Sequence, residues 1–194
     1  MRLFSIWGVG MVLAGAGAYA AEAGLRQAVC LDGHGVVDNF VASRAQAVAT
    51  AVFQDAGVGI VWLSDRQCRN TSGNVIRVEL DLVVPAGFGP EAMAYALPYA
   101  AVGPAIHVFY SRVLRDHRDL PVEVLGYVIA HEIGHVIEGI ARHSAEGVMT
   151  AHWGLHDYAR MKKRQLAFDA QDVRLMHLSL ERLAAALTAQ AARE

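Results

Sequence analysis

The stretch Val128-Ile-Ala-His-Glu-Ile-Gly-His-Val-Ile-Glu-Gly-Ile-Ala-Arg-His143 decides how the rest of this chain is interpreted. It holds His131, Glu132 and His135 in the order H-E-x-x-H. Residues four apart on an α-helix lie on one face, with Cβ atoms about 5–6 Å apart, so one zinc ion can bind a nitrogen of each imidazole. Glu132 follows His131 directly, where its carboxylate can reach a water molecule at the metal without being a ligand, as a general base does.

The residues around the motif favour a buried helix. Residues 122–138 are rich in apolar side chains, Pro121 suits a first helical turn, and Gly139 stands where a helix would stop. Gly126 and Gly134 each cost the helix up to about 1 kcal/mol relative to alanine. Close packing against the sheet or access to the metal would explain them.

A catalytic zinc ion needs a third protein ligand and one open position. His143 is the best candidate, because the chain can turn back at Gly139 and bring this side chain to the helix four residues later. The other candidates for the third ligand are His152, His156, Glu138 and the distant Glu181.

The chain before the motif alternates between strand and helix patterns. Residues 27–31 form a short strand-like run, and an amphipathic helix of about 18 residues follows Asp38, its expected N-cap, up to Gly57. Residues 58–63 then form an apolar strand. The order strand–helix–strand favours a parallel pair with a right-handed crossover.

Three further strands are expected before the motif. Residues 74–84 alternate between polar and apolar side chains, which indicates a strand with one buried face. Residues 94–97 and 105–110 are short strands bounded by Pro98 and Pro104. Proline is confined to edges and strand starts, so one of the two should be the edge of the sheet, where an extended peptide can add as another strand.

The segments around the motif complete the expected fold. Residues 111–120 are charged and indicate a surface helix or loop, and residues from Leu166 onward indicate a C-terminal helix with Asp169 as its N-cap. We therefore expect an α+β fold with an α/β-type N-terminal layer. A small mixed, twisted sheet with an edge strand would pack on two helices, one of them the motif helix.

The N-terminus has the pattern of a signal peptide over residues 1–20. Arg2 precedes an apolar run that ends at Gly17, and Ala18-Tyr-Ala20 fits an A-x-A cleavage site. Cleavage after Ala20 would leave residues 21–194 as one secreted or periplasmic domain. The alternative is an uncleaved membrane anchor.

Export would place Cys30 and Cys68 in an oxidising compartment, where pairing is the default. We expect a disulfide that joins the first strand to the loop after the second. In the alternative, Cys30 holds the protein latent by occupying the open metal position as a thiolate.

Charge and composition argue against several other roles. The formal net charge is −2, without the broad basic face that nucleic acid requires. The short basic cluster of residues 162–164 indicates a solvated turn, and no second apolar run approaches the length of a membrane span. His34 and His107 are expected to be ordinary loop and strand residues.

The motif resembles the metzincin clan of zinc metallopeptidases, whose signature is H-E-x-x-H-x-x-G-x-x-H followed by a turn with a Met beneath the metal. His131, Glu132, His135, Gly139 and His143 match in kind and order, and the resemblance makes Met149 the Met-turn residue. The Gly comes one residue late and the third His two residues late. The run His-Ser-x-x-Gly-x-Met, then a Trp, also looks like small secreted bacterial proteins predicted to be zinc peptidases.

The resemblance implies a Met-turn between the motif helix and the C-terminal helix. The clan's Tyr that follows closely after the Met is absent, since Ala151 stands there. The candidates for its role in stabilising the transition state are Tyr158, His152 and His156.

These features together predict an exported zinc-dependent endopeptidase that acts on a peptide or protein substrate. His131, His135 and His143 would hold zinc, and Glu132 would be the general base. Two alternatives share the site. One is a secreted module that binds zinc without catalysis, and the other is a zinc hydrolase of a non-peptide amide such as cell-wall material.

Overall fold

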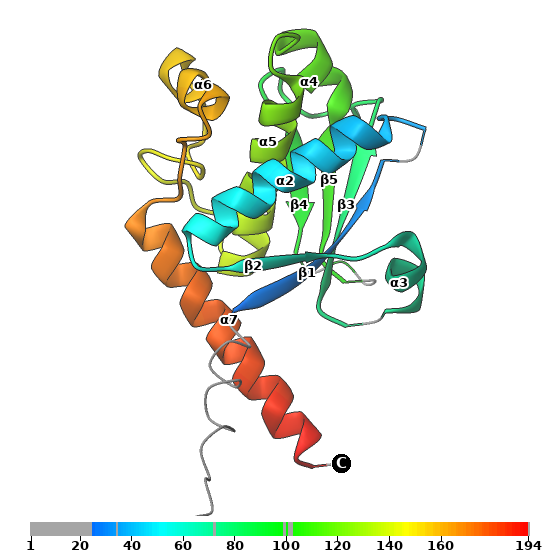
Figure 1. Cartoon of the computed structure of the whole chain (residues 1–194), viewed down its shortest axis with the longest axis vertical. Coiled ribbons are helices and arrows are strands. Elements are labelled where there is room, and N and C mark those ends of the chain that lie inside the picture. The colour runs from blue at the N-terminus through cyan, green and yellow to red at the C-terminus, as the bar shows by residue number, and fades with distance from the viewer. Residues whose placement is uncertain (1–24, 34, 72, 99, 101–102, 194) are drawn as a thin grey trace, which may run out of the picture.

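The computed structural model describes residues 25–33, 35–71, 73–98, 100 and 103–193 (Figure 1). The predicted signal peptide and His34 lie outside these residues. The strands are β1 (Arg26–Asp32), β2 (Gly59–Trp62), β3 (Val75–Asp81), β4 (Ala94–Leu97) and β5 (Ala105–Phe109). The helices are α2 (Asn39–Asp55), α3 (Asp65–Asn70), α4 (Tyr110–Asp116), α5 (Pro121–Glu138), α6 (Leu155–Lys162) and α7 (Ala170–Ala191). Within the described ranges, no helix has the length and apolar character needed to cross a membrane.

The five strands form one mixed sheet in the order β2-β1-β3-β5-β4. β1 pairs in parallel with both β2 and β3, and β3 pairs in parallel with β5. β4 runs antiparallel to β5 at the edge of the sheet. The parallel pair β1–β2, the mixed character of the sheet and the edge position of one proline-bounded strand are therefore confirmed.

The third strand is shorter than the expected range 74–84, because its partner ends. Asp81 pairs with Phe109, the last residue of β5. Beyond that point Leu82 and Val83 have no neighbouring strand in the described part of the sheet, and they are exposed. The polar–apolar alternation continued past the end of the pairing.

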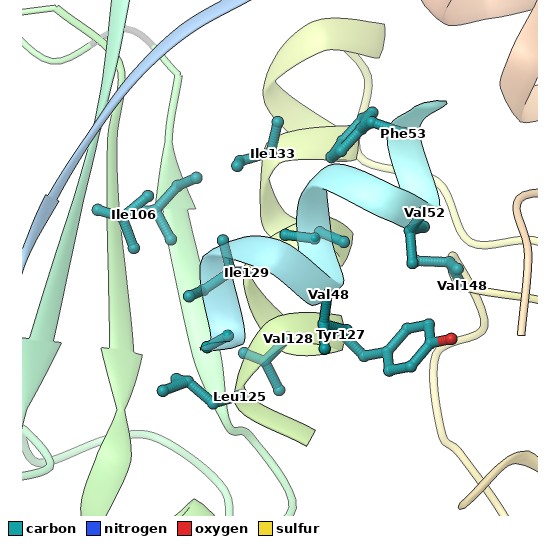
Figure 2. Close-up of a cluster of buried hydrophobic side chains, with 14 of the residues drawn as sticks. Val48, Val52, Phe53, Ile106, Leu125, Tyr127, Val128, Ile129, Ile133 and Val148 are labelled. Atoms are coloured by element: carbon teal, nitrogen blue, oxygen red, sulfur yellow. The ribbon is translucent and has the colours of Figure 1, made fainter. Parts of the chain in front are cut away.

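One face of the sheet packs on α2 and α5, which lie across it in Figure 1. Ile106 of β5 faces Ile129 of α5 in Figure 2, and Val48 and Val52 of α2 belong to the same buried cluster. All of these side chains are buried. Because a fully buried aliphatic side chain contributes about 1.5–3 kcal/mol, this layer fixes the position of the motif helix.

The two glycines of α5 face other elements than the sheet. A Cβ on Gly126 would lie 2.6 Å from Cβ of Val48 and 2.8 Å from the carbonyl oxygen of Ala45, both on α2. A Cβ on Gly134 would lie 2.6 Å from Sδ of Met149. The sequence left packing against the sheet and access to the metal open for these glycines, and the neighbours found are α2 and Met149. Gly126 lets α2 approach α5, and Gly134 makes room for Met149.

The predicted helix ends are largely confirmed. Asp38 caps α2 by accepting a hydrogen bond from the backbone N–H of Val41 at 2.9 Å. Asp169 caps α7 in the same manner. α5 begins with Pro121 and ends at Gly139, whose φ of 69° is the left-handed conformation that glycine adopts readily.

Two short helices differ from the expectation. α3 lies within the loop that was expected after the second strand, and Ser64 and Gln67 form a capping box at its start. α6 follows Gly154, and Met161 is its one buried residue. Helices this short carry too few apolar positions to show a 3.6-residue period.

The structure contains the predicted disulfide between Cys30 and Cys68, with Cα atoms 5.9 Å apart. Cys68 lies on α3 rather than in a loop, so the bond joins β1 to that helix. Val29 and Leu31 pack on the core, so Cys30 between them faces the other side of the sheet. The latent-thiolate alternative is wrong for this structure, because the sulfur of Cys30 is bonded to Cys68.

Candidate metal centre

Helix α5 carries His131, Glu132 and His135, and the first two of these residues line a cleft. The two imidazoles come from adjacent helical turns, and their Nε2 atoms lie 3.0 Å apart. Their ring centroids are 4.7 Å apart, with the planes nearly perpendicular. His131 and Glu132 are each only 9% exposed, whereas His135 is half-buried.

His143 joins this pair from the segment that follows the turn at Gly139. Its ring centroid lies 5.4 Å from that of His131 and 5.0 Å from that of His135. One potential ligand atom from each of the three residues lies within 4.8 Å of the others. The two extra residues between His135 and His143 therefore leave the third imidazole within reach of the other two.

The other candidates for the third ligand have different surroundings. The carboxylate of Glu138 lies 3.5 Å from Nε of Arg142 and has a fully buried side chain. Glu181 is exposed on α7. His152 is exposed and lines the cleft beside His143, while His156 is exposed on α6 and is not part of the cleft lining.

The segment around Met149 supports His131 from below the helix. Nδ1 of His131 donates a hydrogen bond to the carbonyl of Val148 at 2.8 Å. The carbonyl of Met149 accepts from the backbone N–H of Ser144 at 2.8 Å. Met149 itself is fully buried and packs at Gly134, so its side chain holds this turn against the motif helix.

Burial controls the protonation of these groups. It lowers the pKa of His131 to about 4, and the backbone hydrogen bond to Val148 opposes this shift. Burial also lowers the pKa of His135 and of His143, with smaller contributions from neighbouring imidazoles. The three rings are therefore neutral at pH 7, which is the form that binds a metal.

Burial acts in the opposite direction on the carboxyl group of Glu132. It raises the pKa of this group from 4.5 to about 7. A general base is most effective when its pKa lies near the working pH. The environment of Glu132 therefore suits proton transfer near neutrality.

The three imidazoles fit a zinc ion. Because Nδ1 of His131 carries a proton toward Val148, its neutral ring presents an unprotonated Nε2 to Nε2 of His135 at 3.0 Å. Only a proton or another cation between these two nitrogens makes that approach favourable. Three neutral imidazoles are a donor set that zinc prefers, and the hydrogen bond to Val148 is the kind of support that orients a ligating histidine.

The cleft beside these residues has a volume of about 430 Å³. One wall is the segment 89–94, which leads into the edge strand β4. The lining also includes Trp153, whose ring contacts His131 at a centroid distance of 5.6 Å, and Tyr158. The cleft thus connects the edge of the sheet with His131, His143 and Glu132.

Two long-range contacts shape this cleft, and the sequence did not indicate either of them. The hydroxyl of Tyr158 lies 3.3 Å from Nε2 of His117. The guanidinium of the buried Arg112 donates to the carbonyls of Gly89, at 2.6 Å, and Ala92. The charge of residues 111–120 indicated a surface segment, and no local pattern marks a partner so far along the chain.

A second group of potential ligands lies on strands β3 and β5, away from the cleft. Nδ1 of His107 is 3.0 Å from Oδ2 of Asp81 and 3.6 Å from Oε2 of Glu79. The ring of Tyr95 stacks on that of His107 at 4.8 Å. These contacts account for His107 as a strand residue, as expected.

The comparisons with known proteins identify the fold. No protein-family model and no curated protein matches the sequence. The structure is similar to the crystal structure of archaemetzincin from Methanopyrus kandleri, with a TM-score of 0.51 and 16% sequence identity. The match covers 81% of this chain and 97% of the archaemetzincin. At the level of the fold, the metzincin resemblance is therefore confirmed, and the chain has an archaemetzincin-like fold.

Proposed function

We propose that this protein is an exported zinc-dependent endopeptidase. The observation that carries the proposal is the convergence of His131, His135 and His143, with ligand atoms within 4.8 Å. His131 and His143 also line the same cleft as Glu132. The archaemetzincin-like fold supports it. Zinc bound by the three imidazoles would polarise the carbonyl of the scissile bond and lower the pKa of a water molecule to about 7.

Three residues of the cleft would carry out the remaining steps of the reaction. The carboxylate of Glu132 accepts a proton from the attacking water and later donates it to the amine nitrogen as the C–N bond breaks. The half-buried Trp153 excludes water beside His131. We assign the role of donor to the oxyanion to Tyr158, because it lines the cleft and its hydroxyl lies 3.3 Å from Nε2 of His117.

A peptide substrate would lie along the edge strand β4. This strand pairs only with β5 among the described strands, and the segment leading into it forms one wall of the cleft. An extended peptide that adds to a sheet edge forms main-chain hydrogen bonds, while pockets select alternate side chains. Export rests on the predicted signal peptide, and the disulfide between Cys30 and Cys68 is compatible with an oxidising compartment.

The alternatives differ in what surrounds the metal. A zinc module without catalysis would have a closed tetrahedral site, with His152 or Glu138 as a fourth ligand. The ion pair of Glu138 with Arg142 and the cleft beside Glu132 favour the enzyme. A hydrolase of cell-wall amides would use the same metal chemistry with a different substrate in the cleft.

Metal content and cleavage test the proposal together. Purified residues 21–194 should contain one zinc per chain and cut an unfolded protein, and a chelator should stop the cleavage. Glu132→Gln should retain zinc and lose cleavage. Zinc without cleavage of any protein would exclude the peptidase, and release of fragments from isolated cell-wall material would then favour the amide hydrolase.

A further inference from the structure

His143 is flanked in the chain by two residues, Arg142 and Ser144, that bind the same buried carboxylate. Arg142 donates to Oδ1 of Asp172 through its guanidinium. The hydroxyl of Ser144 donates to the same oxygen at 2.6 Å. Asp172 lies in the first turn of α7 and is completely buried. Arg142, Ser144 and Asp172 are called the Asp172 clamp below.

His143 needs such support because packing does not provide it. The side chain of His143 is exposed, and residues 140–143 belong to neither a helix nor a strand. Arg142 and Ser144 both point toward Asp172. The ring of His143, between them in the chain, lies beside those of His131 and His135 instead.

The clamp also connects to the end of α5 and to the Met149 turn. Arg142 pairs with Glu138, the last residue of α5, at 3.5 Å. The backbone N–H of Ser144 donates to the carbonyl of Met149 at 2.8 Å. Oδ2 of Asp172 accepts from the backbone N–H of Asp169 at 3.1 Å, so the carboxylate cannot swing away without breaking the cap of α7.

We propose that Asp172 is the positioning residue for the third metal ligand, acting through Arg142 and Ser144 to aim His143 at the other two imidazoles. The inference rests on the zinc site of the proposed function. It assigns the C-terminal helix a role in metal binding, although α7 contributes no ligand. The connection between His135 and His143 is longer than the metzincin signature, and the clamp holds this longer connection in place.

Zinc affinity tests the clamp, measured by competition with a chromogenic chelator on wild type, Asp172→Ala, His143→Ala and the double variant. Loss of a group that orients a metal ligand costs about 10–100-fold in affinity. We expect a loss of that size for Asp172→Ala in the wild-type background. The loss should largely disappear in the His143→Ala background, because no third ligand is left to position.

The absorption of bound Co²⁺ gives a second readout, since it reports the ligand set. The spectrum of Asp172→Ala should shift toward that of His143→Ala. Asp172→Asn, which keeps an acceptor for Ser144, should recover part of the zinc affinity and of the spectrum. Asp38→Ala is the control, since it removes an N-cap from α2 without contact to the clamp. It should lower thermal stability and leave zinc affinity unchanged.

Wild-type zinc affinity in folded Asp172→Ala would overturn the proposal, as would an equal loss in the His143→Ala background. If Asp172→Ala does not fold, the double variant Arg142→Gln/Ser144→Ala carries the test, because it leaves the cap of α7 intact. These measurements need no substrate. If the protein binds zinc in this manner and cleaves nothing, the role of the clamp is upheld and the proposed peptidase activity is refuted.

Discussion

His131 and Val148 are joined by a hydrogen bond of 2.8 Å from the ring Nδ1 to the backbone carbonyl. The bond connects a helix residue to the residue before Met149, seventeen positions along the chain. It fixes which nitrogen of His131 carries the proton, and so it directs the unprotonated Nε2 toward His135. The backbone, as well as side chains, therefore orients the histidines of the candidate metal centre.

The identity of the third ligand is tested by comparing His143→Ala with His152→Ala. His143 lies with the other two imidazoles, so we expect its loss to reduce zinc affinity by at least the roughly 10–100-fold that an outer-shell partner is worth. His152→Ala should leave affinity close to wild type. Chelator competition measures both. An equal loss in the two variants would make His152 a ligand and would favour the closed, non-catalytic site.

The carboxyl of Glu132 should make the stability of the metal-free protein depend on pH. Its raised pKa means that the folded state keeps a proton which the unfolded chain releases between about pH 4.5 and 7. The stability that this group contributes therefore falls as pH rises through that window. Glu132→Gln removes the effect. The free energy of unfolding of the variant should therefore rise relative to that of wild type by up to roughly 3 kcal/mol across the window.

Urea unfolding of both metal-free proteins at pH 4.5 and pH 7.5 measures this difference. The opposite pH dependence of His131, whose pKa is lowered to about 4, is present in both proteins and cancels from the comparison. A gap between the two proteins that is the same at both pH values would contradict the prediction.

Tyr158 can be tested as a donor to the transition state. Burial raises its pKa, so the hydroxyl keeps its proton at neutral pH, and it lies on the cleft wall. Tyr158→Phe should lower kcat by about 10²–10³, as loss of one oxyanion donor does, with little change in KM. His156→Ala on the same helix is the matched control. An unchanged kcat for Tyr158→Phe would leave this role to another residue.

Gly126 should be intolerant of a side chain. The added Cβ would meet Cβ of Val48 at 2.6 Å and a backbone oxygen of α2 at 2.8 Å, and neither can move without shifting that helix. Overpacking costs about 1–3 kcal/mol, which exceeds the gain of up to about 1 kcal/mol in helix propensity. Gly126→Ala should therefore lower the urea midpoint. Gly89→Ala is the control, since nothing lies within 4 Å of its Cβ.

The disulfide should stabilise the fold without affecting the metal. Cys30 and Cys68 are 38 residues apart. Closing a loop of this length lowers the entropy of the unfolded chain and stabilises the fold by about 4 kcal/mol. Cys30→Ala/Cys68→Ala should lose stability of that order in urea unfolding. Zinc affinity should not change, because Cys30 faces the side of the sheet away from α5. Labelling of either thiol in the oxidised protein would argue against the bond.

The parts of the fold that could be predicted have strong local signals. Pro121 and Gly139 define both ends of α5, and Asp38 and Asp169 mark the starts of α2 and α7. The H-E-x-x-H motif and the later His143 predicted the histidine cluster, because helical spacing fixes the relative positions of His131 and His135. These features depend on residues a few positions apart, whose geometry is set by the helix itself.

The parts that could not be predicted depend on contacts between distant residues. Tyr158 and His117 are 41 residues apart, and Ser144 and Asp172 are 28 apart. Asp172 could be interpreted from sequence only as a favourable charge at a helix start. The sequence also could not show which face of α5 meets α2, so the role of Gly126 was left open.

The hydrogen bonds of Arg112 to the segment before β4 bear on what the proposed peptidase could digest. Its buried guanidinium binds the carbonyls of Gly89 and Ala92, so this wall is tied to α4 and cannot fold over a substrate as a flap would. A wall that is held in place beside the edge strand suits a single extended chain. We therefore expect folded proteins to survive exposure to this protein, and only chains that are already unravelled at the cutting point to be degraded.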